Sequence, residues 1–323
     1  MTDLVKAVGS SLVERTRAVA DLAEDELRRF AMEAARDRDA SALWALTEAH
    51  LTLHGSSGSR VSSHTLAAYR RAVGVLLNDW QSKNLLRPGR NAGVLWVRDL
   101  EAREPSKGNN DTMSPATVRV YLAGAKALYA ALRWSGATDV APFTDVKPAV
   151  DKTPAWEKRE AYTATEIHWL ERVSDGYTLY IVLLGAHAGL RVSEMTALRW
   201  QDVNLSEGAL KVVVGKGGKT ARVYLTPTLT SALEATPLEQ RIGYVLPCRS
   251  RQAVYERLAS VCRQARVTFK GVHALRHASG TRLREETGDL ALVADHLRHA
   301  SLDTARGYAK ANNMQLKRAL GEW

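Results

Sequence analysis

Hydrophobic positions at helical spacing dominate the first part of the chain. Residues 12–37 are charged and alanine-rich, with apolar residues loosely at helical spacing, and predict one or two amphipathic helices. A Gly/Ser stretch at 54–59 then breaks the pattern, and Ser62 or Ser63 can cap a further helix that runs to Trp80. The buried stripe expected for that helix consists of Leu66, Tyr69, Val73, Leu76 and Trp80.

A later helix is marked at both ends by residues that favour helix termini. Ser114 and Pro115 provide an N-cap and a proline at the first helical position, and Gly136 closes the far end. Basic residues recur every seven positions along it, so they drift by only about 20° per heptad and share one face. They are Arg119, Lys126 and Arg133. This basic stripe is either a solvated helix face or a surface that follows a phosphate backbone.

The second half of the chain predicts a mostly α domain with a small antiparallel β-sheet. Prolines and mixed charges with little periodicity mark residues 142–162 as an extended linker, with a domain boundary near residue 157. β-branched runs at 209–214 and 220–226 flank Gly-Lys-Gly-Gly-Lys and predict a hairpin with a basic tip. The remaining expected helices are 163–173, 177–187, 251–266, 274–286, 290–297 and a segment from 302 onward.

Composition and charge narrow the class of protein. The 323 residues contain no apolar run near the roughly 18 needed to span a bilayer. The net charge is +10, yet residues 1–50 hold 7 basic and 10 acidic residues, whereas residues 51–150 hold 13 and 7 and residues 151–323 hold 25 and 18. The basic excess after residue 50 favours a polyanionic partner such as a DNA duplex held between two domains, with scattered solvated lysines as the alternative.

Cysteine usage and the N-terminus predict a cytoplasmic protein, and DNA as the polyanionic partner would make it nucleoid-associated. Cys248 and Cys262 lie fourteen residues apart and outside any C-x-x-C pair, which fits structural thiols in a reducing compartment. No long apolar segment follows the first six residues, so we expect no signal peptide and no membrane partner.

Two motifs that suggest other chemistry fail at one position each. The run ending in Gly-Lys-Thr at 218–220 would need glycine at position 213 to be a phosphate-binding loop, and the chain has Val213. His273 and His277 have the spacing of zinc-protease ligands, but Ala274 stands where the general-base glutamate belongs. The cationic and imidazole groups that remain fit phosphoryl transfer, and we expect no metal and no other cofactor.

Arg191 follows Gly189-Leu190 at a turn between helices, Arg276 lies one helical turn after His273, and His299 precedes Tyr308 by nine residues. The order and spacing of these groups resemble the tyrosine recombinase (phage integrase) family over residues 160–312. Gly189-Leu-Arg-Val-Ser-Glu194 resembles the first arginine box, and His273-Ala-Leu-Arg-His277 resembles the second. Leu297-Arg-His-Ala-Ser301 through Tyr308 resembles the third box with its nucleophile. Two positions depart from the family pattern. Arg298 stands where glycine is common, and Ala305 replaces the usual threonine, with Thr304 one place earlier.

The resemblance implies a catalytic set whose members have distinct roles. Tyr308 would attack the phosphodiester, and because a free tyrosine has a pKa of about 10 it needs a base, for which His273 is the candidate. Arg191 and Arg276 would stabilise the charge on the non-bridging oxygens, and His299 would hydrogen-bond the scissile phosphate. Lys216 on the hairpin would protonate the leaving 5′ oxygen, with Lys219 as the alternative. Glu194 is expected to orient or cap its neighbours.

The same resemblance implies a two-domain architecture that closes around DNA. The expected segments are an acidic helical extension (1–50), a helical core-binding domain (51–145), a linker (146–160), an α+β catalytic domain (161–312) and a tail (313–323). Candidate DNA-binding residues are Arg70, Arg71, Arg119, Lys126, Arg133 and Lys219. The resemblance also implies a homotetramer on two DNA sites, either alone or with a paralogous or accessory protein. Leu316, Leu320 and Trp323 of the tail would pack either on a neighbouring protomer or on their own domain.

The reaction implied is site-specific recombination through a 3′-phosphotyrosine intermediate and a Holliday junction. Integration or excision of a mobile element and resolution of chromosome dimers both fit it. A type IB topoisomerase, which shares the tyrosine and arginine chemistry, is the nearest alternative enzyme. A non-catalytic DNA-binding accessory protein is the alternative from another class.

Overall fold

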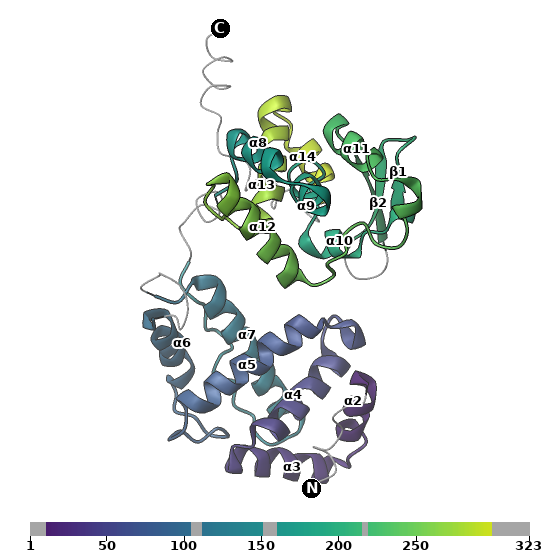
Figure 1. The fold of residues 1–323 in the computed structure, drawn as a ribbon. Coiled ribbons are helices and arrows are strands. Elements are labelled where there is room, and N and C mark those ends of the chain that lie inside the picture. Colours follow the sequence, from purple (N-terminus) through teal and green to yellow (C-terminus); the bar gives the residue numbers. More distant parts are fainter. Residues whose placement is uncertain (1–10, 105–111, 151–159, 215–218, 299–323) are drawn as a thin grey trace. The chain divides into compact units, whose positions relative to one another are not determined.

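The computed structural model describes residues 11–104, 112–150, 160–214 and 219–298, apart from the side chains of Val214 and Lys219. The chain divides into two compact units, Met1–Lys152 and Thr153–Trp323 (Figure 1). Each unit has its own hydrophobic core. No helix in the described segments is long and apolar enough to cross a membrane.

All regular elements in the described part of the first unit are helices. Its elements are α2 (Leu12–Ala20), α3 (Glu24–Asp37), α4 (Ala40–His54), the 3₁₀ turn η1 (Gly58–Arg60), α5 (Ser63–Asp79), α6 (Ala92–Ala102) and α7 (Pro115–Trp134). Ser62 accepts a hydrogen bond from the Thr65 amide at 3.0 Å and so caps α5, while Ser114 does the same for α7. Both caps were predicted.

Helix α4 lies at the centre of this unit, where it contacts α2, α3, α5 and α7. Its apolar side chains surround the helix, and even Glu48 is buried and pairs with Arg15 of α2 at 2.8 Å. The acidic N-terminal segment, described from residue 11 onward, thus contributes α2–α4 to the same core as α5–α7. Trp80, the last residue of the predicted stripe, is fully buried and stacks on Phe143 with ring centroids 5.6 Å apart.

The second unit is built around the apolar helix α9. Its elements are α8 (Ala164–Val173), α9 (Gly176–Ala186), α10 (Val192–Ala197), the 3₁₀ turn η2 (Trp200–Asp202), β1 (Val203–Asn204), β2 (Ala209–Val214), β3 (Lys219–Tyr224), α11 (Pro227–Glu234), the 3₁₀ turn η3 (Leu238–Gln240), α12 (Arg251–Ala265), α13 (Val272–Thr287) and α14 (Leu290–His296). Helices α8, α10, α11, α12 and α13 all contact α9.

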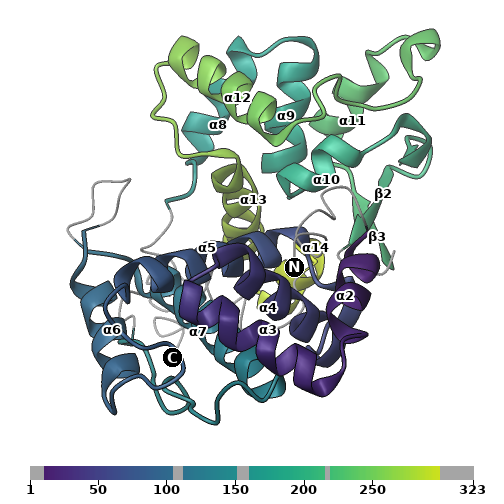
Figure 2. The ribbon, with the colours of Figure 1, turned by 90° about the horizontal axis from the view of Figure 1, so that it is seen from below.

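The three strands form an antiparallel sheet in the order β1-β2-β3 at one side of the second unit (Figure 1 and Figure 2). Lys211 pairs with Arg222 across β2 and β3. The predicted class, mostly α with a small antiparallel sheet, is confirmed. The expected helix from residue 302 onward lies outside the described residues, and α4, α6, α10 and α11 were not predicted.

Candidate active site

The turn that leads into α10 carries the first predicted catalytic arginine. Gly189 has φ +58, and a Cβ there would lie 2.6 Å from a methyl carbon of Leu297, so both the conformation and the space favour glycine. Arg191 is the N-cap residue of α10. Glu194 accepts a hydrogen bond from the Arg191 amide and another from its Nη1, both at 2.8 Å. The prediction that Glu194 caps and orients its neighbours is confirmed.

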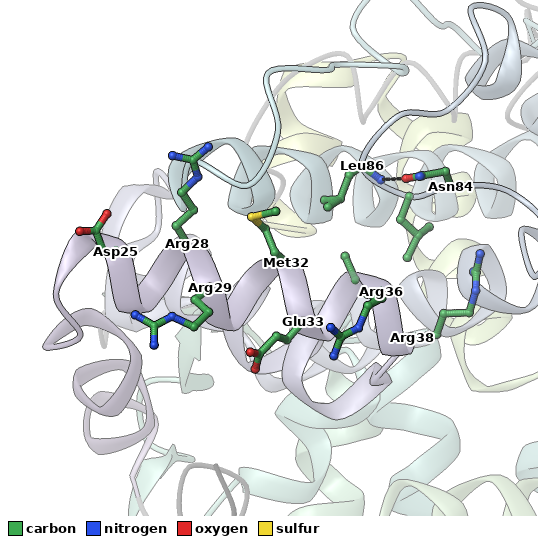
Figure 3. Close-up of a pocket in the computed structure, with 11 residues that line it drawn as sticks. Asp25, Arg28, Arg29, Met32, Glu33, Arg36, Arg38, Asn84 and Leu86 are labelled. Carbon is green, nitrogen blue, oxygen red and sulfur yellow. Dashed lines mark hydrogen bonds between the residues drawn. The ribbon is translucent and has the colours of Figure 1, made fainter.

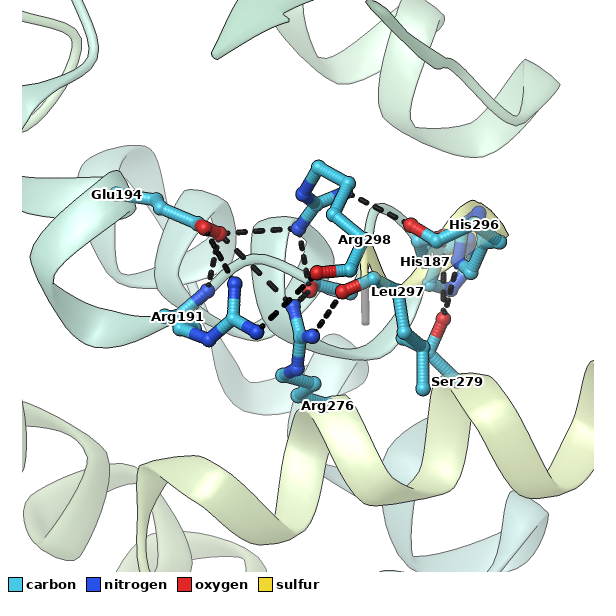
Figure 4. A network of polar contacts seen from close by, with 9 residues as sticks. His187, Arg191, Glu194, Arg276, Ser279, His296, Leu297 and Arg298 are labelled. Carbon is cyan, nitrogen blue, oxygen red and sulfur yellow. Dashed lines mark hydrogen bonds and ion pairs between the residues drawn. The ribbon is translucent and has the colours of Figure 1, made fainter. Parts of the chain in front are cut away.

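Helix α13 brings the second arginine to the same place (Figure 4). Arg276 is 1% exposed and donates hydrogen bonds to the carbonyl oxygens of Gly189 and Leu297. Its Nη1 lies 3.9 Å from Oε2 of Glu194. Residues from all three sequence boxes therefore meet around Arg276.

A third guanidinium completes this network. Arg298, in the turn after α14, donates to Oε2 of Glu194 at 2.9 Å, to the Gly189 carbonyl at 2.8 Å and to the His296 carbonyl at 2.8 Å. Its φ of +53 lies in the left-handed region, which is a physical reason for glycine to suit this position. The sequence marked Arg298 only as a departure from the family pattern, and its contact with Glu194 was missed.

Burial and charge act in opposite directions on this cluster. Burial raises the pKa of the Glu194 carboxyl, but the charge of Arg298 and the hydrogen bonds from Arg191 outweigh it, so the pKa lies below its usual value. Burial also lowers the pKa of Arg298, and Glu194 opposes that shift. The carboxylate is therefore ionised at neutral pH and holds the cations in place.

His296 adds a neutral group at the edge of the network. Burial, followed by the charges of Arg298 and Arg276, lowers its pKa to about 4. Its Nε2 lies 2.8 Å from Oγ of Ser279 on α13, which ties the end of α14 to that helix. His296 is thus an uncharged structural link at neutral pH.

Arg191 and Arg298 open onto a cavity of about 540 Å³ in the second unit. Its lining residues are Arg191, Ser193, Glu194, Ala197, Leu198, Asp202, Lys211, Val212, Val213 and Arg298. The exposed fraction of the Arg191 side chain is 38%, whereas that of Arg276 is 1%. Arg191 therefore lines the cavity, whereas Arg276 is not among the lining residues.

The other predicted catalytic residues differ in how much of them the structure describes. His273 is exposed on α13, one turn before Arg276, and its ring centroid lies 5.6 Å from that of His277. Lys216, His299 and Tyr308 lie outside the described residues. Lys219 begins β3, but its side chain is not described.

All five DNA-binding candidates of the first unit are exposed. Arg70 and Arg71 lie on α5, and Arg119, Lys126 and Arg133 lie on α7. Lys126 already has a structural use, because its Nζ donates to the carbonyls of Thr144 and Val146 at 3.4 and 3.3 Å.

A basic cavity of about 610 Å³ in the first unit was not expected from the acidic residues 1–50 (Figure 3). It is lined by Asp25, Arg28, Arg29, Met32, Glu33, Ala35, Arg36, Arg38, Asn84, Leu85 and Leu86. None of the predicted site residues is among them. The helical spacing of the α3 arginines was the signal available in the sequence.

Comparisons with known proteins identify the family to which the chain belongs. The profile of the phage integrase family matches residues 163–315. Tyrosine recombinase XerC of Pseudomonas fluorescens is 30% identical over 275 residues, covering 79% of this chain and 88% of the relative. XerC of Xanthomonas campestris pv. campestris (strain B100) is 28% identical over 262 residues, covering 77% and 79%. The chain belongs to the phage integrase family of tyrosine recombinases, enzymes that cleave and rejoin DNA.

Solved structures share the fold at low sequence identity. XerH recombinase bound to a palindromic difH substrate, in a post-cleavage complex, has a TM-score of 0.65 at 17% identity, covering 100% of this chain and 98% of that one. A lambda integrase fragment, solved as a dimer on a COC′ core site, has a TM-score of 0.64 at 15% identity, covering 87% and 95%. These likenesses confirm the two-domain recombinase fold.

Proposed function

We propose that this chain is a site-specific recombinase that cleaves and rejoins DNA through a covalent 3′-phosphotyrosine intermediate and a Holliday junction. The observation that carries the proposal is the convergence of Arg191 and Arg276, 85 positions apart in sequence, on Glu194 beside an open cavity. Glu194 holds Arg191, and the carbonyls of Gly189 and Leu297 hold Arg276 beside it. Two planar guanidinium groups fixed in this way are suited to the charge that gathers on a phosphodiester under attack.

The proposed step conserves atoms and charge with this chain's own residues. Tyr308 passes its proton to His273 and attacks phosphorus, and the bond from phosphorus to the 5′ oxygen breaks. Lys216, or Lys219 in its place, protonates the departing 5′ oxygen, while His299 hydrogen-bonds the phosphate. The phosphotyrosine bond retains the energy of the broken linkage, so attack by a new 5′ hydroxyl rejoins the strand without ATP.

We further propose that the first unit binds DNA as a core-binding domain and that the second performs the chemistry. Exposed basic side chains on α5 and α7 support the first role. The DNA-bound state of XerH and lambda integrase supports duplex DNA as the partner. The working assembly is a homotetramer on two DNA sites.

Covalent capture tests this function. The protein is incubated with fragmented source DNA and denatured, and DNA attached to protein is recovered and sequenced, with Tyr308→Phe as the matched control. We expect attachment confined to one short, partly palindromic sequence in the wild-type protein. We expect none in Tyr308→Phe, which lacks the nucleophilic oxygen but retains DNA binding.

The other outcomes separate the alternatives. Attachment scattered over all fragments would support a type IB topoisomerase instead. Tight binding without attachment would support a non-catalytic DNA-binding protein. Attachment that survives in Tyr308→Phe would place the nucleophile elsewhere in the chain.

The basic stripe on α7 predicts a change in the salt dependence of DNA binding. We expect Arg119→Gln to reduce the slope of log Kobs against log salt by about 0.9, the value for one lost phosphate contact. Lys126→Gln should reduce it less, because Lys126 already bonds two carbonyls. Fluorescence anisotropy on a labelled duplex at several salt concentrations measures the slope.

The control for this measurement is Arg36→Gln, which removes the same charge from α3. Arg36 is exposed and makes hydrogen bonds of 2.7 and 3.0 Å to Asp37, so its charge is already paired. An equal slope change in Arg119→Gln and Arg36→Gln would show a general effect of net charge. It would contradict the prediction that the basic stripe on α7 contacts the DNA phosphates.

A further inference from the structure

The turn formed by Leu297 and Arg298 is held by side chains from two other elements. Arg276 of α13 donates to the Leu297 carbonyl, and Nη2 of Arg191 lies 3.5 Å from the Arg298 carbonyl. Consecutive carbonyls of one turn therefore contact the two predicted catalytic arginines. A shift of this turn would change the orientation of both guanidinium groups.

The side chain of Arg298 returns to the same cluster. It is 5% exposed and reaches Glu194 and the Gly189 carbonyl through one nitrogen, Nη2. The Gly189 carbonyl also accepts from Arg276. Arg298 therefore shares an acceptor with Arg276 and lies beside it on the carboxylate.

The two carboxylate oxygens of Glu194 accept hydrogen bonds from Arg191 and Arg298, whereas Arg276 lies farther away. Oε1 accepts from Arg191 Nη1, and Oε2 accepts from the Arg191 amide and from Arg298 Nη2 at 2.8 and 2.9 Å. Arg276 Nη1 lies 3.9 Å from Oε2, beyond hydrogen-bond distance. With Arg298 absent, Oε2 would lose its charged donor at 2.9 Å, and Arg276 could replace that donor by leaving its carbonyl partners.

We propose that Arg298 is a positioning residue of the cleavage site: it occupies the place on Glu194 that Arg276 would otherwise take, and so keeps Arg276 aligned for the phosphate. This inference rests on the proposed function and deepens it. A reacting group displaced by about 1 Å can cost about 100-fold in rate, so the loss of this contact is expected to affect cleavage before binding.

The test compares Arg298→Gln and Arg298→Lys on the duplex recovered by covalent capture. We expect Arg298→Gln to slow single-turnover cleavage by about 10- to 100-fold and to leave the Kd within about threefold. Arg298→Lys should recover much of the rate, because an ammonium can still reach Glu194. The control is Arg282→Gln, an exposed arginine of α13 paired with Glu286, which should cleave like the wild-type protein.

Two further readouts separate positioning from a general structural role. In a Glu194→Gln background, Arg298→Gln should cost less than it does alone, because the carboxylate that would draw Arg276 away is gone. The acid limb of the cleavage rate should also move to higher pH in Arg298→Gln, since the charge of Arg298 is the largest of the influences that lower the pKa of Glu194. Asp202 and Lys211 line the same cavity and are unchanged between the variants.

Each result has a defined consequence. If the wild-type protein cleaves and Arg298→Gln cleaves equally fast, this inference is wrong while the proposed function stands. Costs that add in the double variant, with an unmoved acid limb, would also overturn it. If the wild-type protein forms no covalent complex, the proposed function fails and this inference fails with it. If Arg298→Gln does not fold, Arg298→Lys and its pH profile decide the matter.

Discussion

Replacing Arg276 with lysine is expected to lower the rate of DNA cleavage by about 100- to 1,000-fold, the range for losing one preorganised donor at an oxyanion. Arg276 is almost fully buried and its two terminal nitrogens donate to two different carbonyls, those of Gly189 and Leu297. A lysine ammonium is a single point charge and cannot reproduce this fork. The position of the cation relative to the phosphate is therefore lost even though the charge is kept.

Single-turnover cleavage of the captured duplex measures this effect, with DNA affinity determined separately. The matched control is Arg282→Lys, the same substitution six residues further along α13 at an exposed position. We expect affinity within about threefold of the wild-type value in both variants, since one buried cation contributes little to the phosphate contacts that dominate binding. Equal cleavage by Arg276→Lys and the wild-type protein would remove Arg276 from the catalytic set.

The motif arginines, Arg191 and Arg276, differ from Arg298 in how far the sequence could predict their roles. Arg191 and Arg276 were found because each lies in a short run of residues with a recognisable order. Glu194 follows Arg191 by three residues, so its capping role was also visible in the sequence. The contact between Glu194 and Arg298 spans 104 positions and depends on how the turn after α14 packs on Gly189, which no local pattern reveals.

The same division applies to the fold. Helices α5 and α7 were predicted because serine caps and a proline mark where they begin. Helix α4 was missed because its apolar residues surround the helix and leave no one-sided stripe, as expected for an element at the centre of a unit. Strand β1 has two residues and exists only through its pairing with β2, so tertiary contact rather than propensity determines it.

Removing the shared carboxylate is the second large effect that we expect. Glu194→Ala should lower the free energy of unfolding of the second unit by about 3–5 kcal/mol, the usual cost of breaking a buried ion pair from one side. Arg298 and Arg276 have side chains 5% and 1% exposed, so both charges would lose the counter-charge of Glu194 in a poorly solvated site. At about 2–4 °C per kcal/mol for a unit of this size, the melting temperature should fall by roughly 6–20 °C.

The pH dependence of this difference provides the sharper test. The pKa of Glu194 is lower in the folded protein, so its contribution is fully present above the unfolded value of about 4.3 and is lost as pH falls through the folded pKa. The melting temperatures of wild type and Glu194→Ala should therefore converge on acidification. Glu286→Ala, which breaks the exposed pair with Arg282, should change the free energy of unfolding by no more than about 0.5 kcal/mol at any pH. A gap between wild type and Glu194→Ala that stays constant on acidification would mean that lost packing, and not the charge of Glu194, accounts for the destabilisation.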